Sequence, residues 1–345
     1  MKRVLSFVFI FVMILSFTAG CSNDDSAAST STAQTTTATS TSSEPIVLKL
    51  GHIANPDTAY DNFAHEFKRL IEEGSNGKYE IDIYPSGQLG VDRELMESLQ
   101  IGNVDLTVIT ASDINQFVPE MAVQDLPYLF RDWDHVEKFL DSDVAKEFFG
   151  LTDEVNMTTL GFMPRGFRHV TSNVEPIYTP EQLKNLKIRV AESEIYIDTF
   201  KALGANAQAM AWIEVFTALQ QGTIDAHENT IVTTRDYKIN EVQKYMSETG
   251  HFFAFAALQM NSNLLNSMSE ADQALFRESG LEAAKKLGEE QKNDEASAKA
   301  ELIDLGMSFN EVDDKSAFEA LVSPVYDKFF ETHDRKYFDA IKNIQ

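Results

Sequence analysis

One sequence pattern occurs twice in this chain of 345 residues, once in each half. Residues 94–105 and residues 214–225 both read Glu, five residues, Gln, one residue, Gly, one residue, Val or Ile, and then Asp. In each copy an amphipathic helical stretch ends near a glycine, a common residue at helix ends, and a strand-like run follows. Chance can produce one such joint, but matches at this many positions favour a repeated architecture. The pattern therefore predicts two similar structural units.

Each copy lies within a longer stretch that alternates strand-like and helix-like segments. Residues 187–230 read as strand, helix, strand, helix, strand, and residues 46–110 follow the same order. Parallel strands joined by helices hold ligands beyond their carboxyl ends. The expected fold class is therefore α/β with two lobes, each a mostly parallel sheet flanked by helices. Thr110 and Asn229, near the ends of the third strands, are expected to face a shared cleft.

Three segments are expected to connect the lobes. Thr158–Phe162 and His251–Met260 are apolar runs that are interpreted as strands crossing between them. No proline interrupts Ser269–Leu305, which as one helix would extend about 55 Å at ~1.5 Å per residue. A helix of that length is most simply one that spans both lobes. Trp133–Phe149 is also expected to form one amphipathic helix.

These crossings give the expected lobe boundaries. Lobe I comprises residues 46–165 and 256–296, and lobe II comprises residues 166–255 and 297–345.

The start of the chain is expected to lie outside the fold. Two basic residues precede the apolar run Val4–Phe17, which is shorter than the about twenty residues that span a bilayer, so residues 1–20 are interpreted as a signal peptide. Cys21 is the only cysteine and is interpreted as a lipid attachment point. The Ser/Thr-rich residues 21–45 predict a flexible linker. The protein is therefore expected to be extracytoplasmic and anchored to the cell membrane.

Charge and motif content exclude several classes of function. A formal net charge of -25 argues against nucleic acid and anionic membrane surfaces as partners, and it requires that any anion site be built locally from arginines. The seven histidines lack the spacing of a helical zinc site, and there is no P-loop and no G-x-S-x-G motif. No catalytic residue, metal or cofactor is therefore expected. A hydrolase with paired carboxylates stays open, because such pairs need not be close in sequence.

Two arginines are the main candidates for ligand binding. Arg189 lies on a strand amid apolar neighbours, and Arg168 follows Gly166-Phe167 at the crossing between the lobes. An ion pair within the lobe explains each arginine, and spacing alone favours that interpretation. The alternative is a bidentate clamp on a ligand carboxylate, which suits guanidinium geometry.

Three further side chains have a structural and a functional interpretation. Asn229 is either a turn residue or an amide donor at a strand end, and Trp212 either belongs to the core or forms the wall of a pocket. His52, at the end of the first strand, is either a loop histidine or a donor in the cleft.

Six segments, in this order along the chain, together resemble the extracytoplasmic solute-binding subunit of TRAP transporters, the DctP-like family. The resemblance covers nearly the whole chain from Leu48 onward and implies a two-lobed, periplasmic-binding-protein-like fold with a long helix linking the lobes. The segments are Tyr84–Gly90, Asp125–Tyr128, Gly166–Ser172, Leu186–Val190, Leu203–Ala205 and Glu214–Asn229.

The resemblance also implies roles for particular residues. Arg189 matches the arginine that forms the main salt bridge to the ligand carboxylate, and Arg168 and Asn229 match positions that assist it. Trp212 matches an aromatic position that packs on the ligand. The positions that line the opposite lobe and vary with the substrate are His52, Asp92 and Thr110.

The family implies a small organic acid as ligand, either a C4-dicarboxylate or a sugar acid such as a uronate. Ala191, Thr230 and residues 207–210 replace proline-bearing positions of the family, which leaves the distal end of the ligand open. Thr110 replaces the acidic residue of sialic-acid-binding members, so that ligand is not expected. The implied partners are the small and large permease subunits, with the protein a monomer. A secreted hydrolase with an acidic cleft and a receptor that presents its ligand for signalling are the alternatives.

Overall fold

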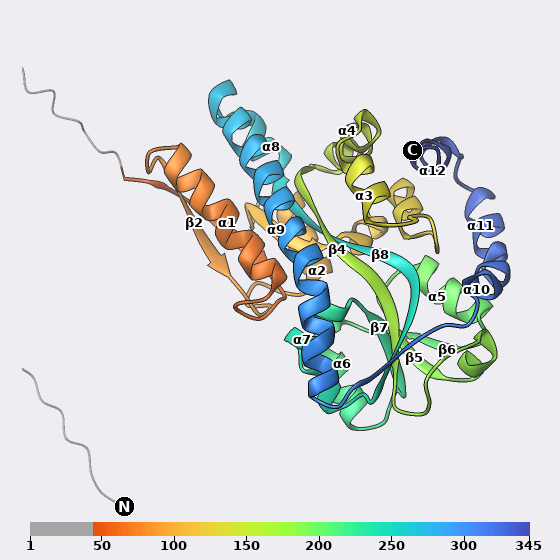
Figure 1. The fold of residues 1–345 in the computed structure, drawn as a ribbon. Coiled ribbons are helices and arrows are strands. Elements are labelled where there is room, and N and C mark those ends of the chain that lie inside the picture. The colour runs from red at the N-terminus through yellow and green to blue at the C-terminus, as the bar shows by residue number, and fades with distance from the viewer. Residues whose placement is uncertain (1–43) are drawn as a thin grey trace, which may run out of the picture. The chain divides into compact units, whose positions relative to one another are not determined.

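The computed structural model describes residues 44–345, and a sheet of nine strands runs through them (Figure 1). The predicted signal peptide at residues 1–20 and the predicted lipidation of Cys21 lie outside the described residues, as does almost all of the linker at 21–45. The strands are β1 (Ile46–His52), β2 (Tyr79–Tyr84), β3 (Leu106–Thr110), β4 (Met157–Ser172), β5 (Lys187–Val190), β6 (Asn206–Ala209), β7 (Ala226–Asn229), β8 (Tyr245–Asn261) and β9 (Ser308–Glu311). The α-helices are α1 (Ala59–Gly74), α2 (Asp92–Gln100), α3 (Trp133–Leu140), α4 (Asp143–Gly150), α5 (Glu194–Ala202), α6 (Val215–Gln220), α7 (Ile231–Asp236), α8 (Ser262–Ser267), α9 (Glu270–Asp304), α10 (Lys315–Leu321), α11 (Ser323–Phe330) and α12 (Lys336–Lys342). The short 3-10 helices are η1 (Ala111–Gln116), η2 (Pro119–Asp125), η3 (Leu151–Val155), η4 (Pro180–Leu183), η5 (Trp212–Glu214) and η6 (Ile239–Glu241).

The two copies of the repeated pattern build equivalent structures, as predicted. Gly102 after α2 and Gly222 after α6 have φ angles of 76° and 67°, a left-handed conformation that favours glycine. Each glycine donates its N–H to the carbonyl three residues earlier, at 3.1 Å in both copies. The aspartates that follow, Asp105 and Asp225, donate their N–H groups to the first strand of their own unit at 3.2 and 2.8 Å. Parallel strands β2-β1-β3 and β6-β5-β7 result.

Two long strands join these units into one sheet. The strand order is β2-β1-β3-β8-β4-β7-β5-β6, with β9 paired to β8. β4 has 16 residues and β8 has 17, and the two strands pair antiparallel along most of their length. The crossings predicted at 158–162 and 251–260 are parts of these longer strands. The two-lobed α/β fold is therefore built on a single continuous sheet.

The long helix predicted at Ser269–Leu305 is confirmed as α9, with 35 residues. Ser269 caps it by accepting a hydrogen bond from the backbone of Asp272 at 3.2 Å. Lys286 of α9 pairs with Glu66 of α1 at 3.0 Å, and Asp294 pairs with Arg235 of α7 at 2.7 Å. Because α1 belongs to the first unit and α7 follows β7 of the second, α9 lies along both (Figure 1).

The single helix predicted at Trp133–Phe149 is wrong. Two helices, α3 and α4, occupy this segment. The Ser142 hydroxyl accepts a hydrogen bond from the backbone N–H of Ala145 at 3.2 Å, which begins a new helix. In a continuous helix this backbone N–H would bond to a carbonyl of the preceding turn. Because it bonds to an N-cap side chain instead, α3 and α4 are separate helices.

Glycines allow α9 to lie close against β4. A Cβ atom at Gly161 of β4 would lie 2.3 Å from the carbonyl oxygen of Gly280 in α9. A Cβ atom at Gly280 would lie 2.5 Å from the carbonyl oxygen of Leu160. Backbone therefore approaches backbone at this crossing, which no other residue type permits without displacement.

Separate apolar clusters stabilise different parts of the sheet. One combines β1, β2, β3, α1 and part of α9, and it includes the fully buried Leu50, Phe63 and Phe276. Two smaller clusters lie in the second unit, around Met246 and around Ile224. Within residues 44–345, no helix is both long enough and apolar enough to span a membrane.

Candidate functional site

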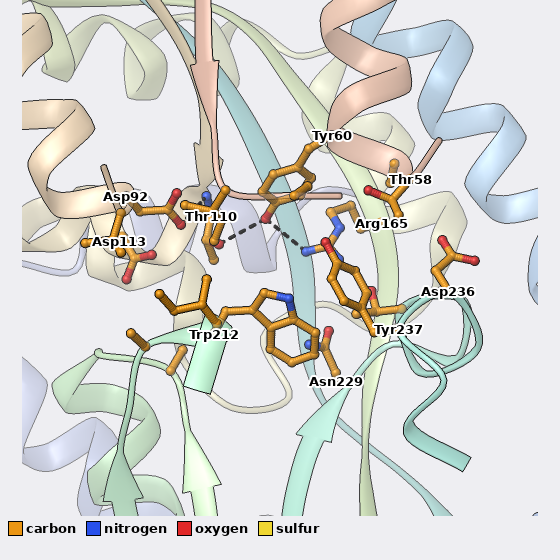
Figure 2. A pocket seen from close by; sticks show the side chains of 18 of the residues that line it. Thr58, Tyr60, Asp92, Thr110, Asp113, Arg165, Trp212, Asn229, Asp236 and Tyr237 are labelled. Atoms are coloured by element: carbon orange, nitrogen blue, oxygen red, sulfur yellow. Dashed lines mark hydrogen bonds between the residues drawn. The ribbon is translucent and has the colours of Figure 1, made fainter. Parts of the chain in front are cut away.

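Side chains from both units meet in a pocket where the parallel strands end (Figure 2). The pocket holds about 800 Å³ of empty space, including open solvent at its mouth. Of the seven ligand-binding residues predicted from the sequence, the pocket lining contains Asp92, Thr110, Arg168, Arg189, Trp212 and Asn229.

Arg189, on β5, brings a buried cation to the pocket without a carboxylate partner. Its Nε and Nη2 both donate to the carbonyl oxygen of Met210, at 2.8 and 2.5 Å, which fixes the guanidinium plane. No ion pair joins Arg189 to an acidic residue in the described part of the chain. Burial lowers the pKa of Arg189 to about 10, so the group is still charged at neutral pH. A buried charge of this kind favours an anionic ligand.

Arg168, on β4, has a partner. Its Nε and Nη2 donate to the two carboxylate oxygens of Glu228 on β7 at 2.6 and 2.8 Å, and both side chains are buried. Burial alone would raise the pKa of Glu228, but Arg168 and a hydrogen bond with His251 outweigh it and lower the pKa to about 2. The ion-pair interpretation therefore holds for Arg168, and its Nη1 is the nitrogen that has no bond to the described residues.

Asn229 and Trp212 lie beside these arginines. The Asn229 Oδ1 accepts the N–H of Thr230 at 2.9 Å, and its Nδ2 has no acceptor among residues 44–345. The Trp212 ring lies 5.7 Å from the Arg189 guanidinium and packs edge-on against Tyr237 at 4.9 Å. Figure 2 shows Trp212 as one wall of the pocket with Asn229 next to it.

A hydrogen-bonded chain links the opposite wall to the second unit. Tyr60 of α1 bonds with the Thr110 hydroxyl at 3.0 Å and accepts from Arg165 Nη1 at 3.1 Å (Figure 2). Arg165 Nη2 donates to the Thr233 hydroxyl on α7 at 2.6 Å. Burial raises the pKa of Tyr60 to about 12, so this phenol stays protonated. Arg165 also forms no ion pair among the described residues.

Two acidic side chains occupy one end of the pocket. Asp92 starts α2 and Asp113 lies in η1, and Figure 2 shows their carboxyl groups side by side. Burial raises the pKa of Asp92, and burial together with the neighbouring Asp92 raises the pKa of Asp113 well above its usual value. Because two adjacent buried carboxylates repel each other, burial and repulsion both disfavour the doubly charged form of the pair.

His52 is the predicted site residue that the pocket lining does not include. It is fully buried at the end of β1, and its Nε2 lies 3.3 Å from Asp61. Burial lowers the pKa of His52, so the ring is largely neutral in this position.

Sequence reasoning missed several polar residues of this pocket, among them Tyr60, Asp113 and Arg165. The sequence did contain a signal for Arg165: Pro164 and Gly166 flank it, and both residue types indicate a bulge or irregularity when they occur within a strand. The strand register shifts between Pro164 and Gly166, which leaves Arg165 without a paired residue on β8. Asp113 follows the end of β3, so the expectation that ligands bind beyond the carboxyl ends of parallel strands also applied to it.

No group of three or more potential metal ligands occurs within residues 44–345.

Comparison with known proteins places this pocket in context. The model of the family "Bacterial extracellular solute-binding protein, family 7", named DctP, matches residues 50–333. A TRAP periplasmic solute binding protein from Bordetella bronchispeptica, with density assigned to pantoate, is 36% identical, with a TM-score of 0.84, and covers 87% of this chain and 99% of its own. A TRAP periplasmic solute binding protein from Polaromonas sp. JS666, bound to D-erythronate, is 32% identical, with the same TM-score and coverage. The C4-dicarboxylate-binding periplasmic protein DctP of Rhodobacter capsulatus is 29% identical over 87% of this chain and 91% of its own length.

Proposed function

This chain belongs to family 7 of the bacterial extracellular solute-binding proteins and is a solute-binding protein of the TRAP type, and we propose that Arg189 anchors the carboxylate of its organic-acid ligand. Pantoate and D-erythronate, bound by two related proteins, are hydroxylated monocarboxylates, whereas the Rhodobacter relative is named for C4-dicarboxylates. The proposed ligands are therefore small organic acids of these two kinds, sugar acids included.

The observation that carries this proposal is the unpaired charge of Arg189. Arg168 is neutralised by Glu228, whereas Arg189 is bonded only to a backbone carbonyl. A carboxylate placed against Nη1 of Arg189 would neutralise the remaining buried charge through charge-assisted hydrogen bonds. Nη1 of Arg168 and Nδ2 of Asn229 are further donors for the same carboxylate, and Trp212 would pack on the ligand.

The function proposed for the whole protein is delivery rather than catalysis. The ligand would be released to the small and large permease subunits of a TRAP transporter, by a monomer that is not an enzyme. Residues 1–20 would direct export, and Cys21 would carry the lipid that anchors the linker at 21–45. The proposed lobes are residues 46–165 with 256–296 and residues 166–255 with 297–345. One apolar cluster lies within the first lobe and two lie within the second, whereas a further cluster, which includes Ile109 and Ile188, combines residues of both.

A thermal-shift screen of monocarboxylates, dicarboxylates, aldonates and uronates, followed by calorimetry, tests this function. A ligand that binds only the folded state raises the melting temperature. Arg189→Met should cost roughly 2–5 kcal/mol of affinity for the best ligand, because it removes one partner of a buried charge pair. Arg277→Met, at an exposed position on α9, is the matched control and should leave affinity unchanged.

Two results would contradict different parts of the proposal. Unchanged affinity in Arg189→Met would exclude the proposed salt bridge and leave solute binding intact. The absence of any stabilising acid in the screen would argue against an organic-acid receptor.

A further inference from the structure

An irregularity in β4 directs the side chain of Arg165 toward the pocket. In a regular strand, side chains an odd number of residues apart point to opposite faces of the sheet. Arg165 and Arg168 are three residues apart, yet both line the pocket, whereas Phe167 lines a separate cavity. The register shift between Pro164 and Gly166 accounts for this, because a bulge inserts one extra residue and changes the direction of its side chain.

The Arg165 guanidinium joins the two units. Nη1 donates to the Tyr60 hydroxyl on α1 at 3.1 Å, and Nη2 donates to the Thr233 hydroxyl on α7 at 2.6 Å. The Tyr60 ring also lies against the guanidinium, with its centroid 4.7 Å from the guanidinium carbon. Because α1 belongs to the first unit and α7 follows β7 of the second, Arg165 contacts both walls of the pocket.

Much of the hydrogen-bonding capacity of this guanidinium is unused. Three of its N–H groups, that of Nε and one on each Nη, have no acceptor among residues 44–345. Arg165 is only 8% exposed. Asp92 and Asp236 lie within electrostatic range of it, but neither comes within the 4.0 Å of an ion pair. Buried cations and unsatisfied donors are costly unless an acceptor reaches them, and the space beside Arg165 is the pocket.

We infer that Arg165 is a second ligand-binding residue: its unused N–H groups donate to an oxygen of the organic acid outside the carboxylate held by Arg189. A guanidinium has donors and no acceptor, so the group that it binds is a hydroxyl, carbonyl or carboxylate oxygen, not an ammonium group or a hydrocarbon. This inference rests on the proposed function, because it takes the first carboxylate to be bound by Arg189. It adds that the ligand carries at least one further oxygen.

The test must separate this contact from a purely structural role. The bonds of Arg165 to Tyr60 and Thr233 connect the two units, so removing the guanidinium should weaken the binding of every acid to some extent. A ligand contact adds a loss that depends on one particular oxygen of the acid. A double-mutant cycle, with one change in the protein and one in the ligand, measures that additional loss.

Two series of acids, in which each analogue lacks one oxygen-bearing group, provide the ligand side of the cycle. The first is D-erythronate with 3,4-dihydroxybutanoate, 2,4-dihydroxybutanoate and 2,3-dihydroxybutanoate, which each lack one hydroxyl. The second is L-malate with succinate, 2-hydroxybutanoate and 3-hydroxybutanoate, which lack the hydroxyl or one carboxylate. If the wider screen yields a different acid, its own deoxy analogues replace these. Displacement calorimetry gives the Kd of each acid for the wild-type protein and for Arg165→Met.

Arg165→Met should weaken the binding of the parent acid about ten- to a hundredfold more than the binding of one analogue, the one that lacks the contacted oxygen. The wild-type protein should bind butanoate, which has no oxygen outside its carboxylate, at least about tenfold more weakly than the parent acid. Thr233→Val is the control, because it removes one bond between Arg165 and the second unit but keeps the guanidinium. It should weaken all acids of a series by the same factor.

The outcomes separate this inference from the proposed function. An equal loss for every acid of the series in Arg165→Met, no loss at all, or binding of butanoate as tight as that of the parent acid would overturn the ligand contact and leave an organic-acid receptor in place. If Arg165→Met does not fold, Arg165→Lys, which has fewer donors, takes its place, and the wild-type comparison with butanoate is unaffected. Binding of no acid from these series or from the wider screen would overturn the proposed function as well.

Discussion

Two buried carboxyl groups near the pocket have pKa values shifted in opposite directions. Glu228 has a pKa of about 2, because its ion pair with Arg168 outweighs the effect of burial. Asp125 accepts a hydrogen bond from Asn115 at 2.6 Å, yet burial dominates and raises its pKa to about 7. Folding therefore favours the charged form of Glu228 and the protonated form of Asp125.

These shifts fix the sign of the dependence of stability on pH. Glu228 stabilises the fold above the ordinary glutamate pKa of 4.5, and this contribution is lost as the pH falls toward about 2. Asp125 acts in the opposite sense: between its ordinary pKa of 3.8 and about 7, only the folded chain retains the proton. Its contribution to stability is therefore lost as the pH rises through that window.

Asp125→Asn should reduce the loss of stability between about pH 5 and about pH 8, because it removes one group that must release its proton. Urea denaturation of the variant and the wild-type protein at both pH values measures this. The loss that persists in the variant is assigned to the other carboxyl groups with raised pKa values, which are Asp92, Asp113, Asp236 and Glu295. An equal loss in both proteins would show that Asp125 titrates normally in the folded state.

For individual residues, the sequence predicted which side chains line the pocket better than it predicted which partners each side chain has. Arg168 and Arg189 had the same two interpretations, and only the pairing of β4 with β7 brings Glu228 to one of them. That pairing joins residues far apart in the sequence, so spacing along the chain could not reveal it. His52 was placed correctly at a strand end, but its ring is buried beside Asp61.

Among the elements, the crossing of α9 over β4 depends on Gly161 and Gly280. Gly280→Ala should destabilise the fold by about 1–3 kcal/mol, because the added Cβ would lie 2.5 Å from the carbonyl oxygen of Leu160. Helix propensity alone predicts the opposite sign, a gain of about 1 kcal/mol. Urea denaturation therefore distinguishes the two effects.

Gly150→Ala in α4 is the matched control, because a Cβ atom there meets no heavy atom within 4 Å. It should be neutral or slightly stabilising. If both variants are stabilised, the close approach of α9 to β4 does not constrain the fold.

Local sequence signals predicted elements well where the signals were strong. The repeated helix–glycine–strand joints, the strand at 187–190 and the cap at Ser269 match the structure. The break between α3 and α4 was missed because the apolar spacing continues through it, although Asp141-Ser142-Asp143 contains a capping residue. The full extent of β4 and β8 was also missed, because long buried strands lack the alternation that marks a half-buried strand.

For the whole molecule, a ligand in the pocket contacts the walls formed by both units, so binding requires the two units to lie close together. Contacts that connect them include the hydrogen bond from the Asn55 N–H to the Tyr237 hydroxyl at 3.3 Å, and the bonds of Arg165 to Tyr60 and Thr233. A bound acid adds further contacts to both walls, so it should favour the closed arrangement, in which the two walls lie close together around the ligand.

Small-angle X-ray scattering should therefore give a smaller radius of gyration with a saturating acid than without it. Arg189→Met, measured at the same acid concentration, is the control and should keep the larger radius. Identical profiles for the wild-type protein with and without ligand would argue against closure.

The sequence predicted the two-lobed organisation because the same unit occurs twice in it. It did not predict that one sheet runs through both lobes, since that depends on which strands become neighbours. The resemblance to a known family added the roles of residues, whereas only the structure shows that the carboxyl groups of Asp92 and Asp113 lie side by side in the pocket.

The continuous pair of β4 and β8, with α9 lying along it, has a mechanical consequence. Any motion that separates the walls of the pocket must bend two hydrogen-bonded strands and a helix together, because no flexible loop alone connects the two units. The energy of this bending is then distributed over many residues of the strands and the helix, and it is released when the walls come back together. The stiffness of this connection would add to the contacts in the pocket, such as that of Arg189, in setting how long a captured acid is retained.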